Sequence, residues 1–118
     1  MNEKTWSWGG VTLPLDIRNI GLMERIEQAG GNLRAAAAAM PKAGAAAENM
    51  RRNYDMFAAF FRTVFGGAAE PLFSDPDDFG ALEDAYFDLM ETICARIGET
   101  ARKRAELAEK YSPERLKK

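Results

Sequence analysis

The sequence predicts a mainly α-helical protein: an antiparallel helical hairpin or three-helix bundle with a short N-terminal β element. Two segments, 50–65 and 79–97, carry apolar residues at the mixed three- and four-residue spacing of amphipathic helices. A third observation is an alternation of apolar residues near the N-terminus, which is typical of short strands. We expect a single domain over residues 1–118, divided into a β element at 5–16, a helical core at 17–97 and a charged tail, helical or flexible, at 98–118.

The β element is expected in "TWSWGGVTLPLD", residues 5–16. Apolar residues alternate on both sides of Gly9-Gly10, which predicts a small hairpin or two short strands. Pro14 restricts this element to a sheet edge, because proline has no backbone N–H to donate. The residues expected on one side are Trp6, Trp8, Val11, Leu13 and Leu15.

The first helical segment is expected between residue 17 and Pro41, which should end it. Gly30-Gly31 predicts a break, with Asn32 as a new cap. The alanine run at 35–39 favours helix but offers little surface to bury, so we expect a thinly packed helix or a mobile connector. One face of this segment should carry Ile17, Ile20, Met23 and Ile26.

The aromatic segment that ends in "FAAFFRTVFGG" is the most regular helical pattern. Gly66-Gly67 should stop this helix, and Leu72 with Phe73 should fold back over its end. An aromatic stripe at helical spacing is far more often core than cofactor site, so these side chains are interpreted as packing. The stripe steps by 4, 3, 4 and 3 through Met50, Tyr54, Phe57, Phe61 and Val64, and Phe60 and Phe65 widen it.

The last helix is expected to be capped by Asp75, with Pro76 in its first position and two further acids in its first turn. It should pack antiparallel to the aromatic helix through a stripe that ends at Ile97. The stripe consists of Phe79, Leu82, Tyr86, Leu89, Ile93 and Ile97.

Charge is polarised along the C-terminal half, although the net charge of the chain is only −2. Residues 70–91 hold eight acids and no bases, whereas residues 96–118 hold eight bases and four acids. The helix dipole and solubility account for this order, and docking against a charged partner or a second copy is the alternative. Arg102, Arg104 and Tyr111 are the candidate partner-binding residues of the tail, which also carries a weak stripe of Ala101, Ala105, Ala108 and Tyr111.

No catalytic or metal-binding constellation is legible, so we expect no enzyme, no cofactor and no metal. Histidine is absent, and the lone Cys94 is interpreted as a small buried hydrophobe beside the apolar stripe. The acids at 75–78 lack the ligand spacing of a calcium loop and are interpreted as helix caps.

The three Gly-Gly pairs lack the lysine of a phosphate loop, and acids dilute the basic tail without an aromatic platform for nucleic acid. No stretch is long and apolar enough to span a membrane, and no secretory signal is legible. One cysteine excludes an internal disulfide framework. We therefore expect a cytoplasmic protein whose partners are proteins.

Four segments, in order, resemble a family of small proteins encoded among the tail genes of long-tailed phages and prophages, similar to tail-assembly chaperones. They are "GVTLPLDI", "LMERIEQA", "FFRTVFGGAAEPLF" and "FGALEDAYFDLMETI", and they cover roughly residues 9–97. The matching motif positions are Phe60, Phe61, Val64, Phe65, Gly66, Leu72 and Phe73. The alanine-rich connector at 35–47 and the basic extension from residue 98 depart from the pattern.

The resemblance implies a non-enzymatic protein that binds the tape-measure or tail-tube protein in the host cytoplasm. One alternative is a secreted helical hairpin of the Trp-X-Gly type, for which Trp8-Gly9 stands before the helices rather than between them. A generic protein-interaction module is the other.

Overall fold

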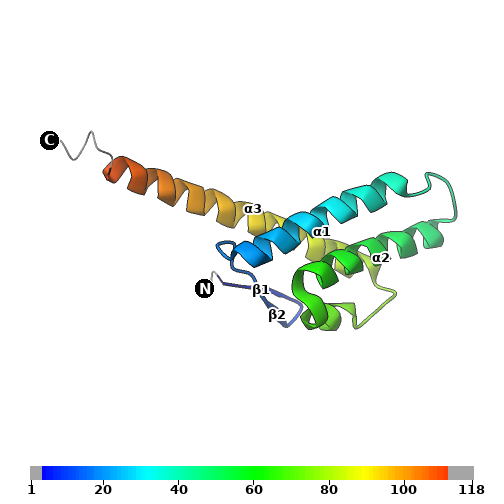
Figure 1. Ribbon diagram of the computed structural model, residues 1–118. Helices are drawn as coiled ribbons and strands as arrows, with labels where there is room; N and C mark the ends of the chain where they lie inside the picture. Colours follow the sequence, from blue (N-terminus) through cyan, green and yellow to red (C-terminus); the bar gives the residue numbers. More distant parts are fainter. Residues whose placement is uncertain (1–3, 112–118) are drawn as a thin grey trace.

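A computed structural model describes residues 4–111 as a two-stranded hairpin followed by three α-helices (Figure 1), which confirms the predicted fold class. An eight-residue 3-10 helix, η1, links the last two α-helices. The elements are β1 Thr5–Trp8, β2 Val11–Pro14, α1 Ile20–Ala39, α2 Ala46–Phe65, η1 Gly66–Phe73 and α3 Phe79–Lys110.

The predicted β element is an antiparallel hairpin in which Trp6 pairs with Leu13 and Trp8 pairs with Val11. Its turn is Gly9-Gly10, and both glycines have positive φ, 53° and 81°. Two consecutive positive φ values match the right-handed twist of the flanking strands, and glycine adopts them without steric cost. The hairpin buries Trp6 and Leu13, and Leu15 just after it, against the helices.

Helix α1 is continuous through Gly30-Gly31, so the predicted break, with its new cap at Asn32, is wrong. Neither glycine has a positive φ, and the helix-favouring alanines that follow carry the helix onward. The cap at its start is Asn19, whose side chain accepts a hydrogen bond from the Leu22 N–H at 2.9 Å. The helix ends before Pro41, as predicted.

The buried face of α1 is shifted from the predicted one. Leu22, Ile26 and Ala29 are buried, whereas Ile20 lies 78% exposed in the first turn. Of the four residues expected on one face, Ile26 is therefore the only one fully buried. The alanine run 35–39 lies in the helix but is exposed, consistent with its small contact surface.

The antiparallel helical hairpin is formed by α1 and α2, not by α2 and α3. Arg25 Nε donates to the Val64 carbonyl at 3.0 Å near one end of the pair. Toward the other end, Ala36 and Met56 line the same surface hollow.

Helix α3 instead starts beside the start of α2 and runs in the same direction. Arg51 in the second turn of α2 pairs with Asp77 at 2.7 Å, and Phe57 stacks with Phe79 and contacts Tyr86. The predicted antiparallel pairing of these two helices is wrong because residues 74–78 return along α2 before α3 begins (Figure 1).

The start of α3 also differs from the expectation. Asp78, not Asp75, is the cap, and its carboxylate accepts from the Ala81 N–H at 3.0 Å. Asp75 accepts instead from the Asp77 N–H at 3.0 Å and closes a local turn. Pro76 consequently lies before the helix.

The predicted aromatic stripe forms the core. Phe61 is fully buried, and its ring contacts Trp6, Phe60, Phe65 and Phe73. The stripe stops short of its predicted ends, because Met50 is 52% and Ile97 is 43% exposed. Cys94 is exposed, so its interpretation as a buried hydrophobe is wrong: Ile93 takes the inward position of that turn.

Gly66 ends α2 as predicted, in a conformation with φ 63° and ψ −146°. Replacing it with alanine should lower the free energy of unfolding by about 1–3 kcal/mol, because this backbone region is nearly restricted to glycine. Gly67→Ala is the matched control, since Gly67 has no positive φ and open space around its Cα. Urea denaturation of both variants checks the assignment, and equal losses would contradict it.

Helix α3 continues well beyond the rest of the fold (Figure 1), and this gives the molecule an elongated shape of 68 × 31 × 21 Å along its principal axes. The tail predicted at 98–118 is therefore helical to Lys110, and residues 101–111 are all exposed. Residues 112–118 lie outside the described part of the chain. The C-terminal part of α3 thus projects from a helical body, and all sides of this part of the helix are exposed.

Candidate protein-binding surface

The N-terminal hairpin is fixed to the middle of α3 by polar contacts over long sequence separations. Arg96 donates to the Leu15 carbonyl at 3.0 Å and to the Thr5 carbonyl at 2.7 Å. The indole N–H of Trp6 donates to Asp88 at 2.8 Å. These bonds place the two ends of the hairpin against α3 just before it leaves the body.

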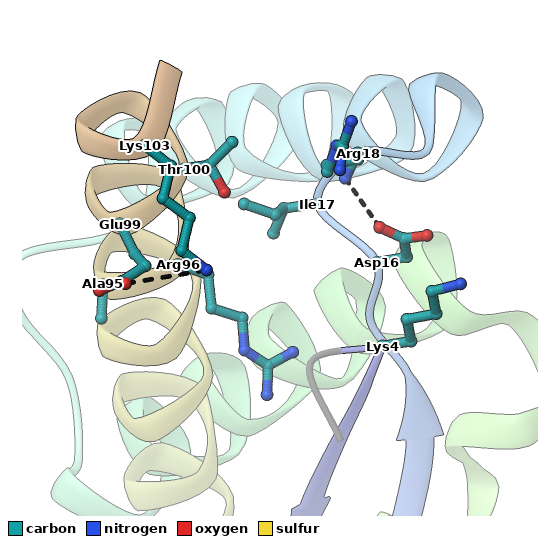
Figure 2. Close-up of a pocket in the computed structure, with 9 residues that line it drawn as sticks. All are labelled: Lys4, Asp16, Ile17, Arg18, Ala95, Arg96, Glu99, Thr100 and Lys103. Carbon is teal, nitrogen blue, oxygen red and sulfur yellow. Dashed lines mark hydrogen bonds and ion pairs between the residues drawn. The ribbon is translucent and has the colours of Figure 1, made fainter. Parts of the chain in front are cut away.

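A groove of about 340 Å³ opens at this junction (Figure 2). Figure 2 shows Ile17 pointing toward α3 from the segment that joins β2 to α1. The Asp16 carboxylate accepts from the Arg18 N–H at 3.0 Å and shapes this segment. One wall consists of Lys4, Asp16, Ile17 and Arg18, and the other of Ala95, Arg96, Glu99, Thr100 and Lys103.

The groove is lined by more bases than acids and also by the apolar side chains of Ile17 and Ala95. Four of its nine lining residues are lysine or arginine and two are acids. Lys103 lies 3.9 Å from Glu99, while Arg96 already binds the two hairpin carbonyls. A groove lined by both cationic and apolar side chains suits a protein segment that carries both carboxylates and aliphatic side chains.

The inward face of α3 continues from this groove along the projecting helix. At about 3.6 residues per turn, this face carries in succession Leu89, Arg96, Lys103 and Leu107. Tyr111 lies beside them. Leu107 is 54% and Tyr111 60% exposed. We call this strip, from Thr100 to Tyr111, the inner face of the projecting helix.

The tail stripe predicted from the sequence does not form a single surface. Tyr111 belongs to the inner face, whereas Ala101, Ala105 and Ala108 lie on the opposite side of the helix at the same helical pitch. The projecting helix therefore has two distinct faces, and the alanines do not continue the buried stripe of α3.

Arg102 and Arg104 differ in their local electrostatics. Arg102 binds Glu99 at 2.8 Å and also pairs with Glu106, and the hydrogen bond to Glu99 raises the pKa of its guanidinium. Arg104 makes no ion pair with any residue in the range 4–111. Of the two, Arg104 has its charge available for another molecule.

The residues that carry the tail-protein resemblance lie in or around the core rather than on this surface. Phe57, Phe60, Phe61 and Val64 are buried, and Phe65, Leu72 and Phe73 are partly buried against them. Gly66 is the exposed end of α2. These positions define the fold, and the sequence pattern brings none of them to the groove.

An ion pair and burial shift the pKa values of two groups around the core, Glu70 and Tyr86. The Arg62 guanidinium, 2.9 Å from Glu70, lowers the pKa of that carboxyl, and burial raises the pKa of the Tyr86 hydroxyl. Both effects stabilise the ordinary charge state of these groups near neutral pH, so neither group is poised for acid–base chemistry.

Sequence reasoning missed the groove residues Lys4, Ile17, Arg18 and Arg96. The inward position of Arg96 could have been predicted from the sequence. Arg96 follows Leu82 and Leu89 at seven-residue intervals and so lies on the apolar stripe of its helix. A cation at such a position needs acceptors inside the fold. The remaining groove residues meet only through tertiary docking.

The fold and this surface define a small helical protein with a docked β-hairpin and a projecting terminal helix. The sequence matches the family of unknown function DUF6673 over residues 9–118, so the chain belongs to that family. No curated protein and no solved structure matches it significantly. Within residues 4–111, no helix is long and apolar enough to cross a membrane.

Proposed function

We propose that this chain is a non-enzymatic tail-assembly chaperone-like protein of a long-tailed phage or prophage, which binds a tape-measure or tail-tube protein in the host cytoplasm. The observation that carries the proposal is the inner face of the projecting helix, which extends an apolar and basic strip beyond the groove. The sequence resemblance supplies the identity of the partner.

The physical argument concerns the stability of the projecting helix. An isolated helix shorter than about 12–15 residues is marginal in water, and the exposed segment 101–110 has no tertiary packing of its own. A partner helix laid along the inner face would cover Leu107 and Tyr111 and enter the groove beside Ile17. Burying these side chains would stabilise both the complex and the end of α3.

The proposed partner segment is an amphipathic helix with acidic side chains. Lys4, Arg18 and Lys103 are among the residues that line the groove, so carboxylates of a partner bound there would lie near cations. The proposal involves no cofactor, metal, nucleic acid or membrane.

The alternatives differ in the partner rather than in the surface. A generic interaction module would use the same groove for another protein, and the secreted Trp-X-Gly reading would require that element between two helices. Trp8, Gly9 and Gly10 lie instead at the turn of the β-hairpin, ahead of every helix.

Deleting residues 102–118 should leave the denaturation midpoint nearly unchanged, because residues 101–111 are exposed and bury little surface. The same deletion should weaken binding to the tape-measure or tail-tube protein encoded beside this chain. The measurement pairs urea denaturation with a binding titration at low and high salt. A truncated chain that binds at full strength would exclude the inner face of the projecting helix.

A point variant tests the inner face without shortening the chain. Leu107→Ser combined with Tyr111→Ser should weaken the same binding at least tenfold, since two exposed apolar contacts are lost. Glu109→Gln, on the other side of the same helix, is the matched control and should bind like the unaltered chain. Equal effects of the two variants would contradict the assignment of the face.

A further inference from the structure

The outer face of α3, opposite the core, is a continuous exposed strip that runs from the body to the end of the projecting helix. Its residues recur at alternating intervals of three and four, the spacing of a coiled-coil seam. Phe87 is 53% exposed on this strip, and a Cβ added at Gly98 would meet nothing within 4 Å. The strip consists of Asp84, Phe87, Glu91, Cys94, Gly98, Ala101, Ala105 and Ala108, all exposed.

We propose that this strip is the interface of a homodimer, in which α3 of a second copy packs against it in antiparallel orientation. The charge distribution along α3 indicates that the strip is covered by α3 of a second copy. Residues 79–91 of α3 contain four acids and no bases, whereas residues 102–104 are three consecutive bases. Antiparallel pairing brings each basic segment onto the acidic half of the other copy, and parallel pairing would place acids against acids.

Side-chain size fixes the register. When Cys94 of one copy lies opposite Gly98 of the other, Phe87 falls opposite Ala105, because residue numbers across an antiparallel pair have a constant sum. The large ring then fills the space that small residues leave, as alternating large and small side chains do in a close-packed interface. Asp84 falls opposite Ala108 in the same register.

The flanking positions agree with this register. The bases at 102–104 of one copy lie opposite residues 88–90 of the other. Glu91 of the second copy lies opposite Ala101, within one helical turn of Arg104. Arg104 makes no ion pair in its own chain within the described residues, so both symmetry-related pairs can form without breaking an existing one. Ile97, which is 43% exposed, lies one residue from the centre of the pair and close to Ile97 of the second copy.

The pairing is compatible with the rest of the molecule. Residues 84–108 would form about 37 Å of paired helix in each copy, at roughly 1.5 Å per residue. The groove lies on the opposite side of α3, so the dimer leaves it open. The inference therefore stands independently of the proposed binding to a tail protein.

Sedimentation velocity of the full chain over a wide concentration range tests the dimer. We expect a concentration-dependent shift to twice the single-chain mass. Glu91→Arg and Arg104→Glu should each weaken dimerisation at least tenfold, because each sets like charges of the two copies within one helical turn of each other. The two charge reversals combined in one chain should restore dimerisation. This recovery would show that each single variant lost the interface contact rather than its fold. A chain that remains single at every concentration, or a double variant that does not recover, would overturn the proposal.

Cross-linking tests the orientation. In a Cys94→Ser background, chains carrying Asp84→Cys are mixed under oxidising conditions with chains carrying Ala108→Cys. Antiparallel pairing should give mixed disulfides between the two variants, because only that arrangement brings the two positions within disulfide reach. A predominance of disulfides between identical variants would show a parallel pair and overturn the proposed register.

Discussion

Replacing Phe61 with alanine is expected to lower the free energy of unfolding by about 3–5 kcal/mol, the range of large aromatic-to-alanine changes in protein cores. Phe61 is fully buried at the junction of three layers. Its ring stacks on Trp6 of the β-hairpin at 6.0 Å between centroids, and meets Phe60 and Phe73 edge-on. The cavity left by alanine would border the hairpin, α2 and η1 together, so local collapse cannot fill it from one side.

Arg62, the next residue of α2, is the control, because its side chain is exposed. It pairs with Glu70 at 2.9 Å, and its guanidinium lies 4.6 Å from the centre of the Phe73 ring, both at the surface. Exposed ion pairs are screened by solvent and contribute little net stability, so Arg62→Ala should cost far less than Phe61→Ala. Urea denaturation of both variants gives the comparison, and similar losses would mean that α2 is rotated from the orientation described.

The sequence predicted those features that depend on neighbouring residues. The alternating apolar residues around Gly9-Gly10 predicted the hairpin, and the aromatic stripe with Gly66 predicted the core face and the end of α2. Pro41 predicted the end of α1. In each case neighbouring residues set both the apolar periodicity of the element and the turn that ends it. No contact with a distant part of the chain is therefore needed to choose between one local structure and another.

The pairing of the helices was not predictable in this way. Residues 66–78 contain a 3-10 helix followed by a segment that returns along α2, and nothing in their composition distinguishes this path from a direct turn. The outcome depends on tertiary contacts such as Arg51 with Asp77. Gly30-Gly31 failed as a break for a related reason, since its small cost is outweighed by the helix and packing on both sides.

The candidate surface was harder to predict than the core. Its two walls lie about 80 residues apart in sequence, and they meet because Arg96 binds the carbonyls of Thr5 and Leu15. Helical spacing indicates which residues of α3 face inward, but not which carbonyls lie there to receive Arg96. The candidate partner-binding residues Arg102, Arg104 and Tyr111, expected in a helical or flexible tail, are all exposed, but they lie on different sides of the projecting helix.

Replacing Trp6 with alanine should cost about 3–5 kcal/mol of unfolding free energy, for a reason that Phe61 does not share. Trp6 is the residue through which the β-hairpin reaches both neighbouring helices. Its ring stacks on Phe61 and Phe65 of α2, and its indole N–H donates to Asp88 of α3. Losing the ring removes the packing and the hydrogen bond together, so the hairpin should detach while the helices remain.

A double-mutant cycle separates the two contributions, with Trp6→Phe keeping a ring and Asp88→Ala removing the acceptor. Asp88→Ala alone leaves the buried indole N–H without its partner, which should cost about 1–3 kcal/mol. In the Trp6→Phe background the same change should cost less, because no donor is left unpaired, and the difference should fall within about 0.5–3 kcal/mol. Urea denaturation of the four proteins measures that difference. Additive losses would show that the indole and the carboxylate do not interact.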